Sequence, residues 1–247
     1  MNPALIAVPA AAALSGAAVS YAAFYPRSQI FGTTICRTVS AQQLALTFDD
    51  GPNPAITPRL LDLLDQFNAR ATFFVIGRFV RECQALTKEV ATRGHLLANH
   101  TQTHPNLFWL GPNAIRNEMR QCQDALQEIV GSPAEYFRPP FGLRNPWVIS
   151  TARELAMQTV LWTLLPGDWR EKPVEWLTPR MQQIAENAQN ATRRNSGDIL
   201  CVHDGAHRHL GGDRSRTLGA LEYWLPRWRD LGLKFVTIAE AVHTTAT

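Results

Sequence analysis

The stretch QLALTFDDGP, residues 43–52, is the part of the sequence that decides the fold. In it, an apolar run ends in two neighbouring aspartates, Asp49 and Asp50, and a Gly-Pro break follows directly. Along a regular strand, successive side chains point to opposite faces, so the two carboxylates would not reach the same place. If Gly51-Pro52 ends the strand, the backbone can turn within the aspartate pair. Both carboxylates can then face one site.

Further β-rich runs follow this one, and helix-like stretches separate them. The runs are residues 71–77, 95–100, 136–140, 157–163, 198–204 and 234–238. The stretches between them carry apolar residues at helical spacing, and several end in glycine, as helix C-termini prefer. Such alternation implies parallel strands joined by helical crossovers. Because no linker divides the runs, the pattern predicts one α/β domain, a small or incomplete (β/α) barrel of about seven parallel strands.

Length, composition and charge limit the classes to which the protein can belong. The chain has 247 residues, of which 45% are hydrophobic, so it can bury a full core and is not a disordered protein. Its formal charge is +3 and no basic run exceeds the pair Arg193-Arg194, which argues against a nucleic-acid partner. The four cysteines show no C-x-x-C spacing, so neither a zinc ribbon nor a redox motif is indicated. Cys83 and Cys122 either pair in an oxidising compartment or remain buried thiols.

The N-terminal segment, residues 1–26, carries no charged side chain. It is long enough to span a bilayer, for which about 20 residues suffice, and it lacks the basic start of a secretory signal peptide. We therefore expect a membrane anchor within residues 1–38, followed by one globular domain in residues 39–247 and located at the cell envelope. A helix packed on its own domain is the alternative. Every proposed catalytic group lies beyond Thr47 and the segment has no charged side chain, so we expect it to be dispensable for the chemistry, and we expect a monomer.

Chemically active side chains gather where the predicted strands end. In a parallel barrel, the chemistry sits at the carboxyl ends of the strands. Here these ends carry six polar residues from distant parts of the chain, namely Asp49, Asp50, His100, Arg138, Asp168 and His203. Chance would scatter such residues among strand starts and helices as well. Their shared position therefore predicts that they converge on one active site.

Two histidines in NHTQTHP, residues 99–105, are candidate metal ligands. His100 and His104 are four residues apart, which is one helical turn, so both imidazoles could face one ion. A lone H-x-x-x-H is a weak signal, and an exposed or core-packed pair would explain it equally well. Two histidines and a carboxylate form a common catalytic zinc set. One carboxylate of the Asp49-Asp50 pair could then bind the metal while its neighbour takes a proton from water, because a coordinated carboxylate is a poor base.

Five motifs in this order resemble those of the polysaccharide deacetylases of carbohydrate esterase family four, which include nodulation chitooligosaccharide deacetylases. They are TFDDGP, H-T-x-T-H, RPPFG, the pair Asp168-Trp169 and ILCVHD, and the similarity covers about residues 42–242. The resemblance implies a distorted (β/α) barrel with one divalent metal ion, usually Zn2+. It also implies removal of N-acetyl groups from aminosugars or of O-acetyl groups from xylan.

The resemblance gives a role to each matching residue at the metal. Asp50, His100 and His104 would be the metal ligands. Asp49 would be the general base, and Arg138 would pair with it and fix its orientation. The metal would polarise the acetyl carbonyl and activate water.

The remaining matching residues would serve the leaving group and the substrate. The backbone N–H of Phe141 would donate to the oxyanion. His203 would be the general acid that protonates the leaving amine, and Asp168 would orient it and raise its pKa. Trp169 is a candidate to stack on a sugar ring. Cys201 replaces a leucine of the family, which makes this wall of the acetyl pocket smaller and more polarizable.

Other residues near the motifs are less informative. Leu165 stands where the family usually has the first aspartate of the fourth motif, so any substrate hydrogen bond from that carboxylate is lost. Trp109 and Trp147 either stack on sugar rings or are simply packed. His207 and His209 lie in a Gly-rich loop, where clustered histidines are usually solvated, so we expect no second metal site there.

The sequence therefore predicts metal-dependent removal of N-acetyl groups from a glycan that contains N-acetylglucosamine, such as chitin oligomers or peptidoglycan. A deacylase of a lipid-linked aminosugar, which the apolar N-terminus favours, is one alternative, and an esterase acting on O-acetyl xylan is another. A third is a carbohydrate-binding relative without activity. The complete set of acid, base and metal positions argues against the third, since a binding module does not need a free base beside a metal ligand.

Overall fold

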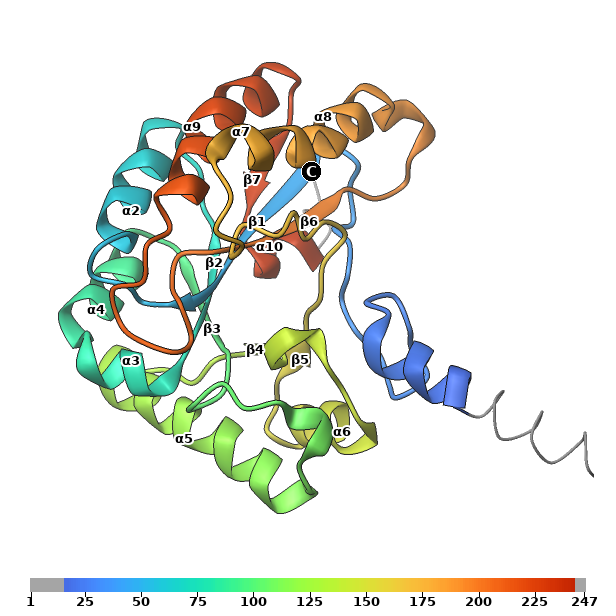
Figure 1. Ribbon diagram of the computed structural model, residues 1–247, viewed down its shortest axis with the longest axis vertical. Helices are drawn as coiled ribbons and strands as arrows, with labels where there is room; N and C mark the ends of the chain where they lie inside the picture. Colours follow the sequence, from blue (N-terminus) through green and yellow to red (C-terminus); the bar gives the residue numbers. More distant parts are fainter. Residues whose placement is uncertain (1–15, 243–247) are drawn as a thin grey trace, which may run out of the picture.

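A computed structural model describes residues 16–242 of the chain as a curled, open sheet of parallel strands with helices on its outer side (Figure 1). The strands are β1 (Gln43–Gly51), β2 (Thr72–Val75), β3 (Leu96–Asn99), β4 (Tyr136–Phe137), β5 (Gln158–Thr159), β6 (Asp198–His203) and β7 (Lys234–Val236). Their order is β5-β4-β3-β2-β1-β6, and β7 pairs with the start of β1. The predicted incomplete α/β barrel of about seven parallel strands is confirmed.

Helices occupy the connections between the strands. They are α2 (Thr57–Gln66), α3 (Gly77–Glu82), α4 (Gln84–Thr92), α5 (Pro112–Val130), α6 (Pro146–Glu154), α7 (Val174–Leu177), α8 (Gln182–Gln189), α9 (Ser215–Asp230) and α10 (Ile238–Val242). Residues 16–242 also contain four short 3-10 helices, η1 (Leu107–Trp109), η2 (Pro140–Gly142), η3 (Thr178–Met181) and η4 (Ala191–Arg193). Helix α5 shows the sequence logic: it starts with a proline, buries an apolar stripe that includes Ile115 and Met119, and ends at Gly131, whose φ is 88°.

Strand β1 lies at the centre of the sheet and carries the Asp49-Asp50 pair. It pairs with β6 along one side, and with β7 at its start and β2 at its end. The side chains of Leu44, Leu46 and Phe48 enter the core between the sheet and the helices. The alternate positions, Thr47 and Asp49 among them, therefore face the inside of the curl.

Two apolar layers fix the sheet. The outer layer joins the strands to helices α2, α5 and α9 and includes Phe48, Phe73, Leu61, Leu126 and Trp228. The inner layer is filled by a second cluster that includes Ala45, Phe74, Tyr136, Val160 and Ile199. Near the carboxyl ends of the strands, buried polar side chains such as Asp49 and Arg138 take over from the apolar ones. Buried charged groups thus gather inside the half-barrel at the carboxyl ends of the strands.

The N-terminal segment is in part a helix that packs on the domain. Residues 16–24 are helical, and Ala22 and Ala23 are buried. Figure 1 shows this helix in dark blue beside the end of the sheet that holds β5. None of the helices within residues 16–242 is both long enough and apolar enough to cross a bilayer. Most of the predicted anchor, residues 1–15, lies outside the described residues.

The cysteines are unpaired. Cys122 is buried in α5, and Cys83 is half-buried between α3 and α4. The sequence left open a disulfide between Cys83 and Cys122 or two free thiols, and the structure shows free thiols.

Candidate active site

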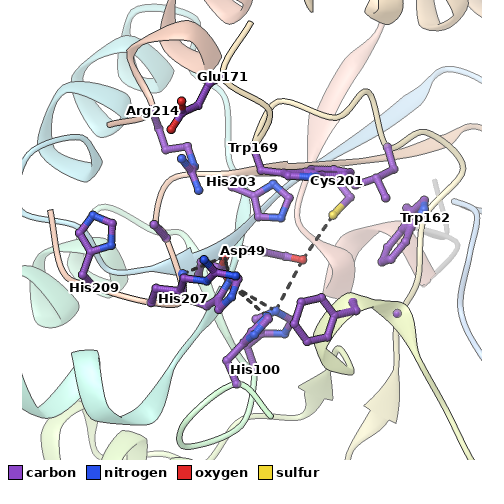
Figure 2. A pocket seen from close by; sticks show the side chains of 17 residues that line it. Asp49, His100, Trp162, Trp169, Glu171, Cys201, His203, His207, His209 and Arg214 are labelled. Carbon is purple, nitrogen blue, oxygen red and sulfur yellow. Dashed lines mark hydrogen bonds and ion pairs between the residues drawn. The ribbon is translucent and has the colours of Figure 1, made fainter. Parts of the chain in front are cut away.

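The two aspartates at the end of β1 reach the same cavity even though they are neighbours. The pairing of β1 with β2 shifts register between Asp49 and Gly51, and Asp50 has a φ of 71°. Such a bulge with one left-handed residue re-aims a side chain that would otherwise point to the opposite face. Both carboxylates line a cavity of about 520 Å3 at the carboxyl end of the sheet (Figure 2). The predicted turn within the pair is confirmed.

Asp49 is held by partners on both carboxylate oxygens. The guanidinium of the fully buried Arg138 donates to Asp49 Oδ1 at 2.6 Å and to Thr47 Oγ1 at 2.8 Å. The Cys201 thiol donates to Asp49 Oδ2 at 3.3 Å, and Figure 2 shows Asp49 between this thiol and His100. Burial, together with the nearby Asp49 carboxylate, raises the pKa of the Cys201 thiol well above its ordinary value, so the thiol remains a donor. The expected Asp49–Arg138 pair is therefore present.

Two histidines that follow β3 lie against the Asp50 carboxylate. His100 Nε2 lies 3.6 Å from Asp50 Oδ1, and His104 Nε2 lies 3.2 Å from the same oxygen. His100 Nδ1 lies 2.8 Å from the carbonyl oxygen of Arg138, which fixes the ring and leaves Nε2 directed at the carboxylates. Metal-binding histidines are commonly held in this way through their second nitrogen.

The expected helical turn between His100 and His104 is absent. Residues 100–104 form a loop in which Thr101 and His104 have φ angles of 70° and 62°. Asn99 Oδ1 accepts from the Thr101 N–H at 2.8 Å, and Thr101 Oγ1 accepts from the His104 N–H at 3.0 Å. These side-chain acceptors stabilise a tight turn in place of a helix. The two imidazoles converge as predicted, but through a different backbone conformation.

His207 also belongs to this cluster although its side chain is one-third exposed, so this histidine of the Gly-rich loop joins the first site. Its backbone N–H donates to Asp50 Oδ2 at 3.2 Å, its Nδ1 lies 3.6 Å from that oxygen, and its ring stacks on His104 at 4.4 Å. The possible ligand atoms of Asp50, His104 and His207 all lie within 4.8 Å of one another. His209, in contrast, is exposed.

A close approach of two backbones brings His207 to this place. A Cβ atom on Gly205 would lie 2.0 Å from the carbonyl oxygen of Asp50, so only glycine allows the loop after β6 to pass here. In the sequence, the available signal was this glycine, which follows the ILCVHD motif directly.

The protonation states of the cluster suit a divalent metal ion. Burial lowers the pKa of His100 and lowers that of His104 to about 3, so both imidazoles are neutral. Burial alone would raise the pKa of Asp50, but the hydrogen bond from His207 and the nearby histidines hold it well below its usual range. Within the described residues, the buried Oδ1 of Asp50 has no hydrogen-bond partner. A charged carboxylate beside neutral imidazoles, with a free oxygen, is the donor set that such an ion requires.

His203, at the end of β6, is held in its protonated form. Its Nδ1 lies 2.9 Å from Asp168 Oδ1, and its backbone N–H donates to Asp168 Oδ2 at 2.7 Å. Thr217 Oγ1 donates to the same oxygen at 2.9 Å, so the carboxylate is fixed from two sides. Burial would lower the pKa of His203, but the Asp168 carboxylate outweighs it and raises the pKa to about 9. Asp168 reaches the site from the loop after β5 and not directly from a strand end.

Phe141 lies at the edge of the same cavity. It is the middle residue of η2 and has a φ of 59°. The two hydrogen bonds that close this short helix come from the N–H groups of Gly142 and Leu143, so the Phe141 N–H takes no part in them. Its ring lies edge-on to His104, with 4.7 Å between the ring centroids.

Some of the residues considered for substrate binding line the cavity, and others lie away from it. Trp169 lines the cavity, is 41% exposed and lies edge-on to His203. Cys201 and Leu165 also line it. Trp109 and Trp147 are exposed but are not among the residues that line this cavity.

The fold and this site place the chain in a known family. Residues 37–160 match the family model described as polysaccharide deacetylase, and the chain belongs to that family, carbohydrate esterase family four. A peptidoglycan-N-acetylglucosamine deacetylase of Bacillus cereus is 39% identical over 197 residues, which cover 80% of this chain and 86% of the relative. A chitooligosaccharide deacetylase of Azorhizobium caulinodans is 31% identical, with 80% and 93% covered. Among solved structures, the Bc1960 peptidoglycan N-acetylglucosamine deacetylase superposes with a TM-score of 0.75 at 28% identity, covering 86% of this chain and 93% of the other.

Proposed function

We propose that this protein hydrolyses the N-acetyl group of N-acetylglucosamine residues in a glycan, either peptidoglycan or a chitooligosaccharide. The observation that carries the proposal is that a carboxylate held by a buried arginine and a protonated imidazole face one cavity. Asp49 is ion-paired with Arg138, and His203 is kept protonated by Asp168. The names of the relatives in Bacillus and Azorhizobium support the same class of substrate.

The metal proposed for this site is a single Zn2+ ion. Asp50, His100 and His104 would hold it, and His207 lies close enough to take part. When bound, such an ion polarises a carbonyl group and lowers the pKa of water.

The chain's own groups then divide the chemistry of amide hydrolysis. Asp49 Oδ1 accepts from the charged Arg138 guanidinium, whereas Oδ2 accepts only from the weak thiol donor of Cys201, so Oδ2 accepts the proton of the attacking water. The Phe141 N–H donates to the oxyanion that develops on the acetyl oxygen. His203 Nδ1 is held by Asp168, so its Nε2 carries the proton that the leaving amine takes up as the C–N bond breaks.

The same cavity suggests how the sugar is placed. Trp169 offers an exposed aromatic face beside His203, on which a sugar ring would stack. Cys201 would line the acetyl pocket. We further propose that residues 39–247 form the catalytic domain and that the uncharged N-terminal residues attach the protein to a membrane of the cell envelope, on the evidence of their composition.

The proposal is tested by acetate release from acetylated glycans. The zinc-loaded full chain is incubated with peptidoglycan fragments, chitin oligomers and an activated aryl acetate, and the products are identified by mass spectrometry. An amine must be protonated to leave, whereas an activated phenolate leaves unaided. We therefore expect His203→Ala to nearly abolish N-deacetylation and to spare much of the aryl acetate hydrolysis. No acetate from any aminosugar would reject the function, and an equal loss on both substrates would reject the role of His203.

A further inference from the structure

Arg144 is a fully buried arginine that lies outside the catalytic groups described above. Its Nη2 donates to the carbonyl oxygens of Ala22 at 2.9 Å and Tyr25 at 2.7 Å, and its Nη1 donates to the carbonyl oxygen of Gly142 at 3.2 Å. Within the described residues, all hydrogen bonds of this guanidinium go to backbone carbonyls. The backbone N–H of Arg144 adds a contact to the Ala23 carbonyl at 3.4 Å.

A buried cation without an acidic partner is unusual, because burial of an unpaired charge is costly. Burial lowers the pKa of Arg144 to about 10, so the group is still charged at neutral pH. The carbonyls that surround it come from the last turn and the end of the helix formed by residues 16–24. The C-terminal end of a helix carries a partial negative charge and free carbonyl oxygens, so it can compensate a cation.

The carbonyl group of Gly142, the third that the guanidinium binds, connects Arg144 to the active site. Gly142 directly follows Phe141, and the two residues have φ angles of 68° and 59°. A left-handed conformation at a residue other than glycine persists only where the surroundings hold it. A Cβ atom on Gly142 would also lie 2.5 Å from the Trp162 ring, so this loop has little freedom to shift.

We infer that the helix formed by residues 16–24 positions the active site, because Arg144 ties its terminal carbonyls to the loop that carries Phe141. Arg144 is a positioning residue in this scheme, and the inference rests on the oxyanion role proposed above for the Phe141 N–H. The sequence-based expectation that residues 1–26 are dispensable considered side chains only. Arg144 uses backbone carbonyls, which any residue supplies, so their contribution does not show in the sequence.

The test uses the full chain with three single substitutions. Arg144→Met removes the charge and the donors, and Arg144→Lys keeps the charge but lacks the planar fork that reaches several carbonyls. Arg153→Met changes an exposed arginine on the neighbouring helix α6 and serves as the control. Hydrogen–deuterium exchange is followed in residues 16–26 and 140–143, and kcat, KM and zinc affinity are measured in parallel.

We expect Arg144→Met to accelerate exchange in both segments. It should lower kcat by about 10-fold or more, but by less than the factor of about 10² to 10³ that is lost when an oxyanion donor is removed. An oxyanion donor serves amides and esters alike, so both activities should fall by the same factor, with KM and zinc affinity nearly unchanged. Arg144→Lys should show a smaller effect of the same kind, and it decides the question if Arg144→Met does not fold.

Two results would overturn the inference. Faster exchange in residues 16–26 alone, with unchanged kcat, would mean that Arg144 holds the helix but not the Phe141 loop. A kcat that falls only together with zinc affinity would indicate a general loss of structure. If the wild-type protein releases no acetate at all, the proposed function fails, and exchange in residues 140–143 still decides whether Arg144 fixes that loop.

Discussion

Asp49 and Asp50 are neighbours in the chain but have different partners, and this difference predicts different effects of substitution. Asp50 contacts three histidines, whereas Asp49 contacts Arg138 and Cys201 and lies 3.9 Å from a single histidine, His100. We expect Asp50→Ala to lose bound zinc. Asp49→Asn should keep zinc and lose about 10² or more in rate, the usual contribution of a general base. Two measurements check this division of roles: the metal content of each variant after dialysis, and its rate of acetate release. Equal metal loss in both variants would contradict it.

His100 and His207 compete for the place of third metal ligand. The atoms of His207 cluster more tightly with Asp50 and His104, but His207 is one-third exposed, whereas His100 is buried with its Nδ1 held by a carbonyl. A pre-oriented, buried imidazole loses less freedom on binding. We therefore expect His100→Ala to weaken zinc binding by about 10²-fold or more and His207→Ala to weaken it less. Competition with a zinc-sensitive dye measures both, and the opposite order would make His207 the ligand.

His203 predicts the alkaline limit of activity. Its pKa is raised to about 9 by Asp168, and the protonated form is the one that can donate, so N-deacetylation should decline as the pH rises through about 9. Asp168→Asn removes the negative charge that favours imidazolium, and the alkaline limb should move to lower pH. The pH profile of kcat on an amide substrate checks this. An unmoved limb would show that another group sets it.

At the scale of elements, the loop after β6 is fixed by Gly205. A Cβ atom there would collide with the carbonyl oxygen of Asp50, so Gly205→Ala should push the loop and His207 away from the metal ligands. We expect weaker zinc binding with the fold retained, as seen by circular dichroism. Gly211→Ala in the same loop is the control, because its Cβ meets no atom within 4 Å and only its φ of 80° is strained, a cost of about 1 kcal/mol. Equal effects of the two substitutions would contradict the steric argument.

The elements themselves were largely predictable, because long apolar runs separated by helical patterns determine parallel strands. The strands after β1 are all shorter than their runs, and two of them, β4 and β5, keep only two residues each, for local reasons. β4 ends at Phe137 because Pro139 and Pro140 supply no N–H to a ladder. β5 ends at Thr159, after which Val160 forms a bridge with Ile35 and the Thr163 N–H donates to the carbonyl oxygen of Ile199 in β6.

The site was predictable where its residues follow strands and unpredictable where loops meet. The convergence of Asp49, Asp50 and His203 on one cavity follows from their places at strand ends, whereas the role of each was implied by the resemblance of the motifs. His207 escaped prediction because its partner, Asp50, is 157 residues away and the contact depends on the glycine between two backbones. The turn at His100 escaped it because side-chain acceptors, and not helical periodicity, set its backbone.

At the scale of the whole molecule, the candidate metal ligands join distant parts of the chain. Asp50, His104 and His207 come from β1, from the loop after β3 and from the loop after β6. An ion bound only by the folded state adds about 2.7 kcal/mol at a concentration of about 100 times Kd. For a chain of this size, we expect chelation to lower Tm by about 5–10 °C. Calorimetry with and without a chelator measures this, and a similar response of Asp50→Ala would place the bound ion elsewhere.

The central position of β1 has a consequence for how the protein would lose activity. In many proteins, functional groups lie on segments that open locally at low cost, so activity can fail while most of the structure persists. Here Asp49 and Asp50 belong to a strand that is paired with three others and buried from Leu44 to Gly51. Opening this strand means dismantling the sheet. The base and the carboxylate ligand should therefore be lost only in global, cooperative unfolding, so that heat inactivation and denaturation are one event.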